Sequence, residues 1–222
     1  MIPSHSSTTA LIIFAKAPVA GLAKTRLIPA LGAQGAAALA TRLLEHSVAM
    51  GLAAGFDHLE LCTTPDIHDD AFQSLAARHA LELTTQQGND LGERMDRALK
   101  RVLDTHSRVL LVGTDAPSLD TAVLRAAAAS LDRFEAVFVP ALDGGYVLVG
   151  LTRPASSLFS DMLWSTAQVM EATRARAAAA QLSWTELEPV ADIDEPSDLV
   201  HLPREWLPWS SDYSLIRSFA LP

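Results

Sequence analysis

Residues 10–27 read ALIIFAKAPVAGLAKTRL, and this stretch decides the fold that the rest of the chain follows. The apolar run at 10–14 is typical of a buried strand, and an alanine-rich helical pattern follows the loop after it. The loop carries Lys16, Gly21, Lys24, Thr25 and Arg26. Glycine permits close backbone approach, and long cations spread positive charge over several phosphate oxygens. The stretch therefore predicts a strand, a polyphosphate-binding loop and a helix.

The loop is not a P-loop, although Lys24 and Thr25 resemble the end of that motif. A P-loop has glycine directly before its lysine, and this chain has Ala23 there. The added Cβ would obstruct the nest of backbone amides around a phosphate. We therefore interpret Lys24 and Arg26 as phosphate ligands in a different loop, and the alternative is a solvated loop with no ligand.

Composition limits the classes of protein that need consideration. The 222 residues suit one α/β domain, and 49% hydrophobic with 19% charged residues is typical of a globular chain. A net charge of −9 argues against general nucleic-acid or anionic-membrane binding, so an anion site must be a local basic pocket. Cys62 is the only cysteine, which excludes an intramolecular disulfide and a cysteine-based zinc cluster. The first residues lack the basic region of a signal peptide, and we expect a cytoplasmic protein.

Strand-like and helical patterns alternate along the chain. Strands are expected at 10–14, 58–63, 81–84, 108–113, 136–140 and 146–151. Helices are expected at 34–50, 69–78 and 119–131, and another follows the segment 86–92 and ends at about 103. The last helix would begin with a capping box at Ser165 and end at 180. Such alternation predicts a mostly parallel sheet with helices on both faces and binding at the carboxyl ends of the strands. We expect a single domain over 1–222. Its tail, 204–222, would pack on the domain or on a second subunit, which leaves a homodimer open.

Carboxylates follow the strand-like runs in the middle and near the end of the chain. Asp115 comes just beyond the apolar run 108–113, after Thr114, and Asp192 and Asp194 alternate around Ile193. Oxygen ligands suit Mg²⁺ or Mn²⁺, which usually binds one or two carboxylates together with substrate phosphates. The alternatives are a turn at Asp115 and a helix cap at Asp194. For Asp194 we favour the cap because Pro196 lies two residues on, for Asp115 we favour function, and for Asp192 both remain open.

Two glycine-containing segments carry further candidates. Asp143, Gly144, Gly145 and Tyr146 predict a hairpin turn, because Asp-Gly is a strong turn signal. In a functional interpretation the glycines admit an acceptor, the carboxylate binds a metal or hydroxyl, and the tyrosine stacks on the ligand.

The second segment, 87–94, joins a glycine loop to the start of a helix. Gln87, Gly88 and Arg94 would then border an anion or a base edge. The alternative is simple helix capping by Asn89 or Asp90, which is compatible with the first interpretation.

Taken together and in order, the motifs resemble one family. They are KAPVAGLAKTRL at 16–27, QGNDLGERM at 87–95, GTDAP at 113–117 and LDGGY at 142–146. The chain resembles the bacterial glycosyltransferase-like DUF2064 group within the nucleotide-diphospho-sugar transferase superfamily, over about residues 11–199. The segment 192–199 is similar to the closing motif of nucleotidyltransferases such as 2-phospholactate guanylyltransferase and the molybdenum-cofactor enzymes.

The resemblance implies a three-layer α/β/α sandwich of the GT-A type with a mixed, mainly parallel sheet. It also implies that Lys24 and Arg26 bind phosphates, that Asp115 holds a metal, and that Asp192 or Asp194 completes the metal site. Our leading hypothesis is a Mg²⁺-dependent (or Mn²⁺-dependent) transferase acting on a nucleoside triphosphate or nucleotide-sugar, with a small-molecule acceptor. The cations slightly favour nucleotidyl transfer. The alternatives are a glycosyltransferase and a non-catalytic nucleotide or metabolite sensor on the same fold.

Overall fold

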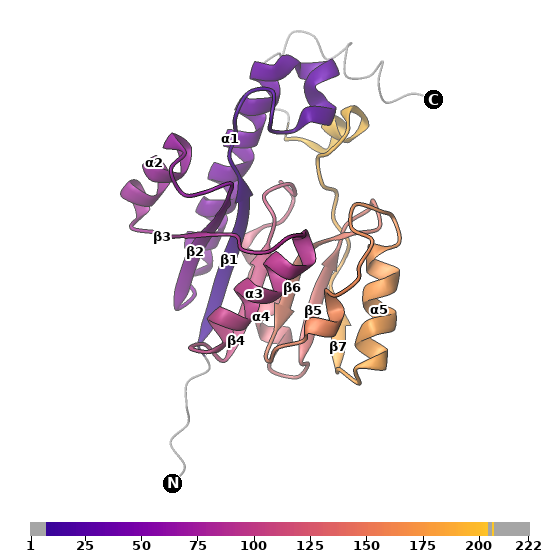
Figure 1. Cartoon of the computed structure of the whole chain (residues 1–222). Coiled ribbons are helices and arrows are strands. Elements are labelled where there is room, and N and C mark those ends of the chain that lie inside the picture. The colour runs from indigo at the N-terminus through magenta and orange to yellow at the C-terminus, as the bar shows by residue number, and fades with distance from the viewer. Residues whose placement is uncertain (1–7, 204–205, 207–222) are drawn as a thin grey trace.

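A seven-stranded sheet forms the centre of the computed structural model, which describes residues 8–203 and 206 (Figure 1). The strand order is β3-β2-β1-β4-β6-β5-β7. Only β6 runs antiparallel to its neighbours, so the predicted mixed, mainly parallel sheet is confirmed. The strands are β1 Thr9–Lys16, β2 His58–Thr64, β3 Glu82–Thr85, β4 Arg108–Val112, β5 Ala136–Pro140, β6 Tyr146–Leu151 and β7 Trp184–Glu186.

Helices cover both faces of the sheet. They are α1 Ile28–Ala54, α2 Asp70–His79, α3 Leu91–Leu103, α4 Thr121–Ser130 and α5 Val169–Ala179, with short 3₁₀ helices η1 Thr25–Leu27, η2 Ser156–Leu158 and η3 Pro196–His201. Side chains of α1, α2 and α4 share one hydrophobic core, and those of α3 and α5 share the core on the opposite face. Figure 1 shows the resulting three layers, with α3 in front of the sheet and α1 behind it.

The central position of strand β1, covered on both faces, explains its continuous apolar run at 10–14. Leu11 and Ile13 point into the core with α1 and α4, whereas Ile12 and Phe14 point into the core with α3. Residues 9–15 are all buried. A parallel strand covered on both faces needs apolar side chains at every position, which is why this run could be identified from sequence.

The sheet reverses its strand order at β1. From β1 the chain adds β2 and β3 on one side and β4 on the other. In open α/β sheets this switch point leaves a crevice between the loops that leave adjacent strands at their carboxyl ends. The loops after β1 and β4 carry the residues that the sequence singled out, so the topology brings them to one place.

The segment after β7 returns to the loop that follows β1. Ile193 and Leu199 are buried in a third hydrophobic cluster with Leu27 and Leu43, so η3 packs beside the start of α1 (Figure 1). Trp206 continues this contact, with its ring 5.0 Å from the ring of His46 on α1. The rest of the predicted tail lies outside the described residues.

The start of α5 differs from the prediction. The capping box at Ser165 is wrong, because α5 begins at Val169, its N-cap is Gln168, and no side chain caps it. Ser165 has a positive φ of 61° and lines the pocket described below. The preceding loop packs so closely on the β5–β6 turn that a Cβ at Gly144 would lie 2.2 Å from the carbonyl oxygen of Ala167. Tertiary packing therefore overrides the local capping signal.

One helical stretch among the described residues, Thr25–Ala54, is long and apolar enough to cross a membrane by length and composition. This is weak evidence, because the core helix of a globular domain passes the same test. The buried side chains of α1, among them Leu43, Leu44 and Val48, pack in the cores of this domain.

Candidate functional site

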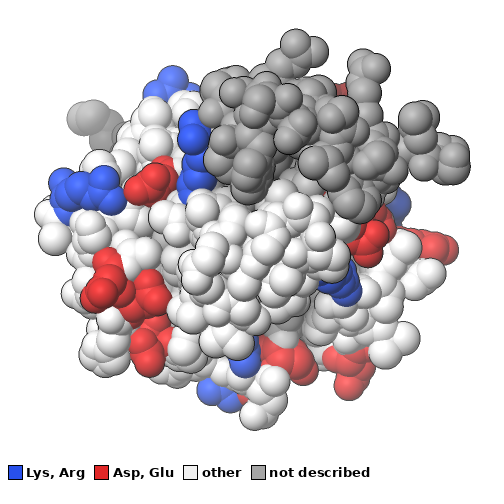
Figure 2. Space-filling model, turned by 90° about the horizontal axis from the view of Figure 1, so that it is seen from above, with Lys and Arg blue, Asp and Glu red and all other residues white. Residues whose placement is uncertain are grey.

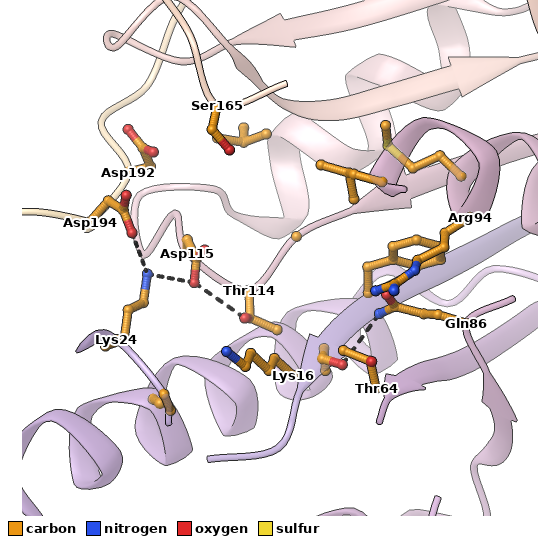
Figure 3. Close-up of a pocket in the computed structure, with 18 of the residues that line it drawn as sticks. Lys16, Lys24, Thr64, Gln86, Arg94, Thr114, Asp115, Ser165, Asp192 and Asp194 are labelled. Carbon is orange, nitrogen blue, oxygen red and sulfur yellow. Dashed lines mark hydrogen bonds and ion pairs between the residues drawn. The ribbon is translucent and has the colours of Figure 1, made fainter. Parts of the chain in front are cut away.

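A pocket of about 550 Å³ opens where β1 and β4 end (Figure 3). Most of the predicted site residues line it. They are Lys16, Lys24, Thr25, Arg26, Arg94, Asp115, Tyr146, Asp192 and Asp194. The structure thus brings basic residues from the start of the chain together with acidic residues from its middle and end.

Lys24 is bound to carboxylates of its own chain. Its Nζ lies 2.7 Å from Oδ1 of Asp115 and 4.0 Å from Oδ1 of Asp194, and it donates to the carbonyl oxygen of Ile193 at 2.5 Å. The side chain is only 8% exposed, and its backbone has the left-handed angles φ 47° and ψ 46°. Lys24 therefore ties the loop after β1 to the segment before η3, and its ammonium is paired within the chain.

Asp194 also belongs to this ion-pair network. It pairs with Arg26 and lies close to Lys24. Our interpretation of Asp194 as a helix cap is wrong, because η3 begins at Pro196 and its N-cap is Glu195, which forms a capping box with Asp198. The helix starts one residue later than we predicted, so the Asp194 carboxylate is free to face the loop.

Asp192 differs from the other two carboxylates. It is half-buried, and within the described ranges no cation lies at ion-pair distance from it. Burial raises the pKa of Asp192 to about 6, and the negative charges of Asp143, Asp198 and Asp115 add to the increase. Asp192 is partly desolvated and surrounded by negative charges, so a cation bound beside it would be stabilised.

The carboxylates do not by themselves form a complete metal cage. Among residues 8–203 and 206, no group of three or more His, Cys, Asp or Glu side chains is arranged to hold an ion. Asp115 and Asp192 nevertheless present hard oxygen donors to one pocket. Mg²⁺ and Mn²⁺ accept such a set when substrate phosphates and water supply the remaining ligands. The donor set therefore fits an ion that protein and substrate hold jointly.

Arg94 lies at the other end of the pocket from Asp192 (Figure 3). Its Nε donates to the carbonyl oxygen of Gly88 at 3.1 Å, which fixes the guanidinium. No carboxylate in the described part of the chain pairs with it. An anchored arginine whose terminal nitrogens remain available is suited to phosphate or to the carbonyl edge of a base.

Gln86, and not the predicted Gln87, lines the pocket beside Arg94. Its Nε2 donates to the carbonyl oxygens of Ala15 and Cys62 at 3.3 and 3.1 Å, so its Oε1 is left to accept from a ligand. Gln87 is exposed and lies outside the lining. The sequence does not separate Gln86 from Gln87, because β3 shows no regular alternation of buried and exposed side chains that would indicate which one faces the pocket.

The glycines have structural roles that we did not predict. Gly88 lies outside the lining, with φ 146°, and a Cβ there would lie 2.8 Å from the backbone nitrogen of Arg94. Gly21, also outside the lining, has φ 82° with open space around it, so it serves the turn of the loop. Lys16, which does line the pocket, donates through Nζ to the carbonyl oxygen of Leu22 at 2.8 Å.

The predicted acceptor segment divides into a turn and one pocket residue. Asp143, Gly144 and Gly145 lie outside the lining, and the Asp143 carboxylate accepts from the Gly145 N–H at 2.8 Å, which supports the hairpin interpretation. Tyr146 lines the pocket and packs against Trp164 with ring centroids 6.4 Å apart. Burial raises the pKa of Tyr146 far above its ordinary value, so the phenol stays protonated and presents an aromatic wall.

The fold is that of nucleotidyl and nucleotide-sugar transferases. The chain is similar to a protein from Desulfovibrio desulfuricans G20 that is provisionally assigned as a nucleotide-diphospho-sugar transferase, with a TM-score of 0.81 and 29% identity over 96% of this chain and 95% of that one. It shares its fold with the Mth528 nucleotidyl transferase from Methanothermobacter (TM-score 0.62, 16% identity, 90% and 98% covered). The same holds for Rv0371c of Mycobacterium tuberculosis H37Rv in complex with manganese (0.54, 18%, 89% and 98%).

The chain belongs to the DUF2064 family. The family described as "Uncharacterized protein conserved in bacteria (DUF2064)" matches residues 47–166, more than half of the chain. No curated protein matches the chain. The family resemblance inferred from the motifs is therefore confirmed.

Proposed function

We propose that this protein is a metal-dependent transferase that acts on a nucleoside triphosphate or a nucleotide-sugar, with nucleotidyl transfer favoured. The observation that carries the proposal is the convergence of Lys16, Lys24, Arg94, Asp115 and Asp192 on one pocket at the switch point of the sheet. Long cations suit phosphate oxygens, and carboxylates suit the ion that accompanies them.

The phosphates of the donor would occupy the centre of the pocket. Lys16 and Thr25 face this region from the loop after β1. Arg94 and Gln86 close it at the far end, where a base or the distal part of the donor would bind. A surface with few basic side chains supports a small ligand: in the described part of the face seen in Figure 2, lysines and arginines are scattered and form no broad patch.

The carboxylates would hold the metal against the phosphates. Asp115, Asp192 and Asp194 would provide its protein ligands, and the bound ion would neutralise charge that develops on the phosphates during transfer. Arg26, held by Asp194, would stabilise the leaving phosphates from the loop side. Catalysis would then depend on positioning and charge stabilisation, without a covalent enzyme intermediate. Burial raises the pKa of the Cys62 thiol to about 11, so this cysteine is a poor nucleophile.

The acceptor would enter beside Ser165, which lies on the Asp192 side of the pocket (Figure 3). Tyr146 would form the wall of its path toward α3, where the phenol oxygen lies 3.9 Å from the sulfur of Met95. In nucleotidyl transfer, an acceptor oxygen forms a bond to the α-phosphorus and the bond to the β-phosphate oxygen breaks, releasing pyrophosphate. Glycosyl transfer is the second candidate, and the similarity to the protein from Desulfovibrio supports it. There the same groups would stabilise a departing nucleoside diphosphate.

The test combines turnover and binding on the full chain. Purified protein is given a panel of nucleoside triphosphates and nucleotide-sugars with Mg²⁺ or Mn²⁺ and candidate acceptors, while pyrophosphate and nucleoside diphosphate release are measured. Pyrophosphate release supports nucleotidyl transfer, nucleoside diphosphate release supports glycosyl transfer, and binding without either product supports a sensor. Failure of every donor to bind would refute the proposal.

Variants on one helix separate the pocket from the general surface. Arg94→Ala should weaken donor binding by about 1.5–3 kcal/mol, the range for a hydrogen bond to a charged group. Arg97→Ala is the matched control, because Arg97 lies on the same helix, is 55% exposed and pairs with Glu93 outside the pocket lining. Equal binding by both variants would remove Arg94 from the donor site.

A further inference from the structure

We infer that Lys24 is a built-in cation that holds the place of a divalent ion between Asp115 and Asp194 until the phosphates of a donor draw it away. The inference rests on the metal-dependent part of the proposed function and assigns the order in which the ligands of that site exchange. It goes beyond a phosphate-binding lysine, because it predicts that Lys24 opposes metal binding when no nucleotide is present.

The oxygen atoms around Lys24 are the first observation. Nζ lies 2.7 Å from Asp115, 4.0 Å from Asp194 and 2.5 Å from the carbonyl oxygen of Ile193. Two carboxylates and a backbone carbonyl are the oxygen ligands that a hard divalent cation prefers. In this structure the ammonium of Lys24 lies among these oxygens (Figure 3), and Arg26 pairs with the other carboxylate oxygen of Asp194.

The frame that carries these oxygens is fixed independently of Lys24. Ile193 is fully buried, and its N–H donates to the carbonyl oxygen of Asp115 at 2.8 Å. This bond holds the segment 192–194 to the loop after β4. The residue that can move is Lys24, whose side chain has four rotatable bonds and whose left-handed backbone is unfavourable for a residue other than glycine.

Two cations cannot share this position. A divalent ion binds carboxylate oxygens at 2.0–2.6 Å, as a general range for Mg²⁺ and Ca²⁺, so it would overlap an ammonium held at 2.7 Å from the same oxygen. Like charges at such separations also repel strongly when partly buried. The ion therefore gains Asp115 and Asp194 only as Lys24 leaves, and donor phosphates offer Lys24 new acceptors in the same pocket. Ion and donor should consequently bind with positive cooperativity.

Lys16 provides a comparison for Lys24, because it is a second lysine in the same pocket with different partners. Lys16 lines the same pocket but donates to a backbone carbonyl, that of Leu22, and pairs with no carboxylate of the described chain. Replacing Lys16 removes one positive charge from the pocket without releasing a carboxylate. Lys16→Met is therefore the matched control for Lys24→Met.

The experiment measures Mn²⁺ affinity in the absence of nucleotide, by following the electron paramagnetic resonance of free Mn²⁺ during titration of the full chain. Lys24→Met should bind Mn²⁺ at least tenfold more tightly than the wild type, whereas Lys16→Met should change the affinity less than threefold. Lys24→Gln should also gain affinity, because its amide keeps hydrogen-bonding capacity but not the charge, and it serves if the methionine variant does not fold. Lys24→Arg should retain the weak wild-type affinity.

The outcomes separate this inference from the proposed function. Unchanged or weaker Mn²⁺ binding by both uncharged Lys24 variants overturns the inference, and so does an equal gain by Lys16→Met. The proposed function is judged independently, by donor binding and product release of the wild type. A further requirement is that Lys24→Met binds Mg²⁺-triphosphate more weakly than the wild type while it binds Mn²⁺ alone more tightly; loss of both affinities also overturns the inference.

Discussion

Asp192→Asn should stabilise the protein while it damages the site. The pKa of Asp192 is raised from 3.8 to about 6, chiefly by burial, so its charged form is disfavoured in the folded state. A shift of that size corresponds to about 3 kcal/mol at most, at about 1.4 kcal/mol per unit. Because the side chain is only half-buried, solvent screening reduces this, and we expect a gain of about 1–2 kcal/mol at pH 7.5.

The pH dependence follows from the direction of the pKa shift. Between the unfolded value of 3.8 and the folded value of about 6, the folded protein binds a proton that the unfolded chain has released. The contribution of Asp192 to stability is therefore fully present below pH 3.8 and is lost as the pH rises through about 6. Asparagine cannot ionise, so the stability difference between variant and wild type should grow across this window and stay constant above it.

Urea denaturation at several pH values, followed by tryptophan fluorescence, measures this difference. For a domain of this size the gain corresponds to an increase in Tm of about 2–8 °C. Asp194→Asn is the control, because its carboxylate pairs with Arg26 and Lys24 and its loss should destabilise by up to about 1 kcal/mol. If Asp192→Asn is equal to or less stable than the wild type at pH 7.5, the carboxylate has a favourable partner and the reasoning is refuted.

Three further substitutions test the structure around the pocket. Gly144→Ala should destabilise by about 2 kcal/mol or more, because its Cβ would lie 2.2 Å from the carbonyl oxygen of Ala167 at a φ of 96°; thermal unfolding measures it. Glu60→Gln should cost about 1.5–3 kcal/mol in urea denaturation, because Glu60 is fully buried and accepts two bonds from Arg101, whose side chain is half exposed. Gln86→Leu should cost about 1–2 kcal/mol by the same assay and weaken donor binding by calorimetry, since it removes both bonds to the strand carbonyls.

The fold could be predicted largely because each central strand is covered on both faces. The runs that became β1, β4 and β5 are buried along nearly their whole length, so their apolar character is continuous and visible. Strand β7 was not predicted, since its three residues, Trp184–Glu186, are only partly buried and pair along one edge with β5. Such a strand is defined by its neighbour, and no local pattern indicates it.

The site could be predicted as a set of residues but not as a set of contacts. Strand ends carry functional groups in sheets of this kind, which pointed to Asp115 and to the loop before Lys24. The ion pair between Lys24 and Asp115 joins residues far apart in the chain, and the contact of Lys24 with Ile193 spans 169 residues. Capping signals at Asp194 and Ser165 failed for the same reason, because packing of distant segments determined where each helix begins.

The carboxylates of the pocket argue for a cation-assisted reaction rather than simple nucleotide sensing. Asp115, Asp192 and Asp194 lie among the cations that would bind phosphates, and each negative charge repels a polyphosphate. A protein that only binds a nucleotide would gain affinity by losing Asp192, whose ionisation also disfavours the folded state. Retaining it is understandable if a divalent ion comes between carboxylate and phosphate. Triphosphate affinity should therefore rise with Mg²⁺ in the wild type, and this dependence should diminish in Asp192→Asn; a wild type that binds triphosphate equally well in the presence of a chelator would contradict the argument.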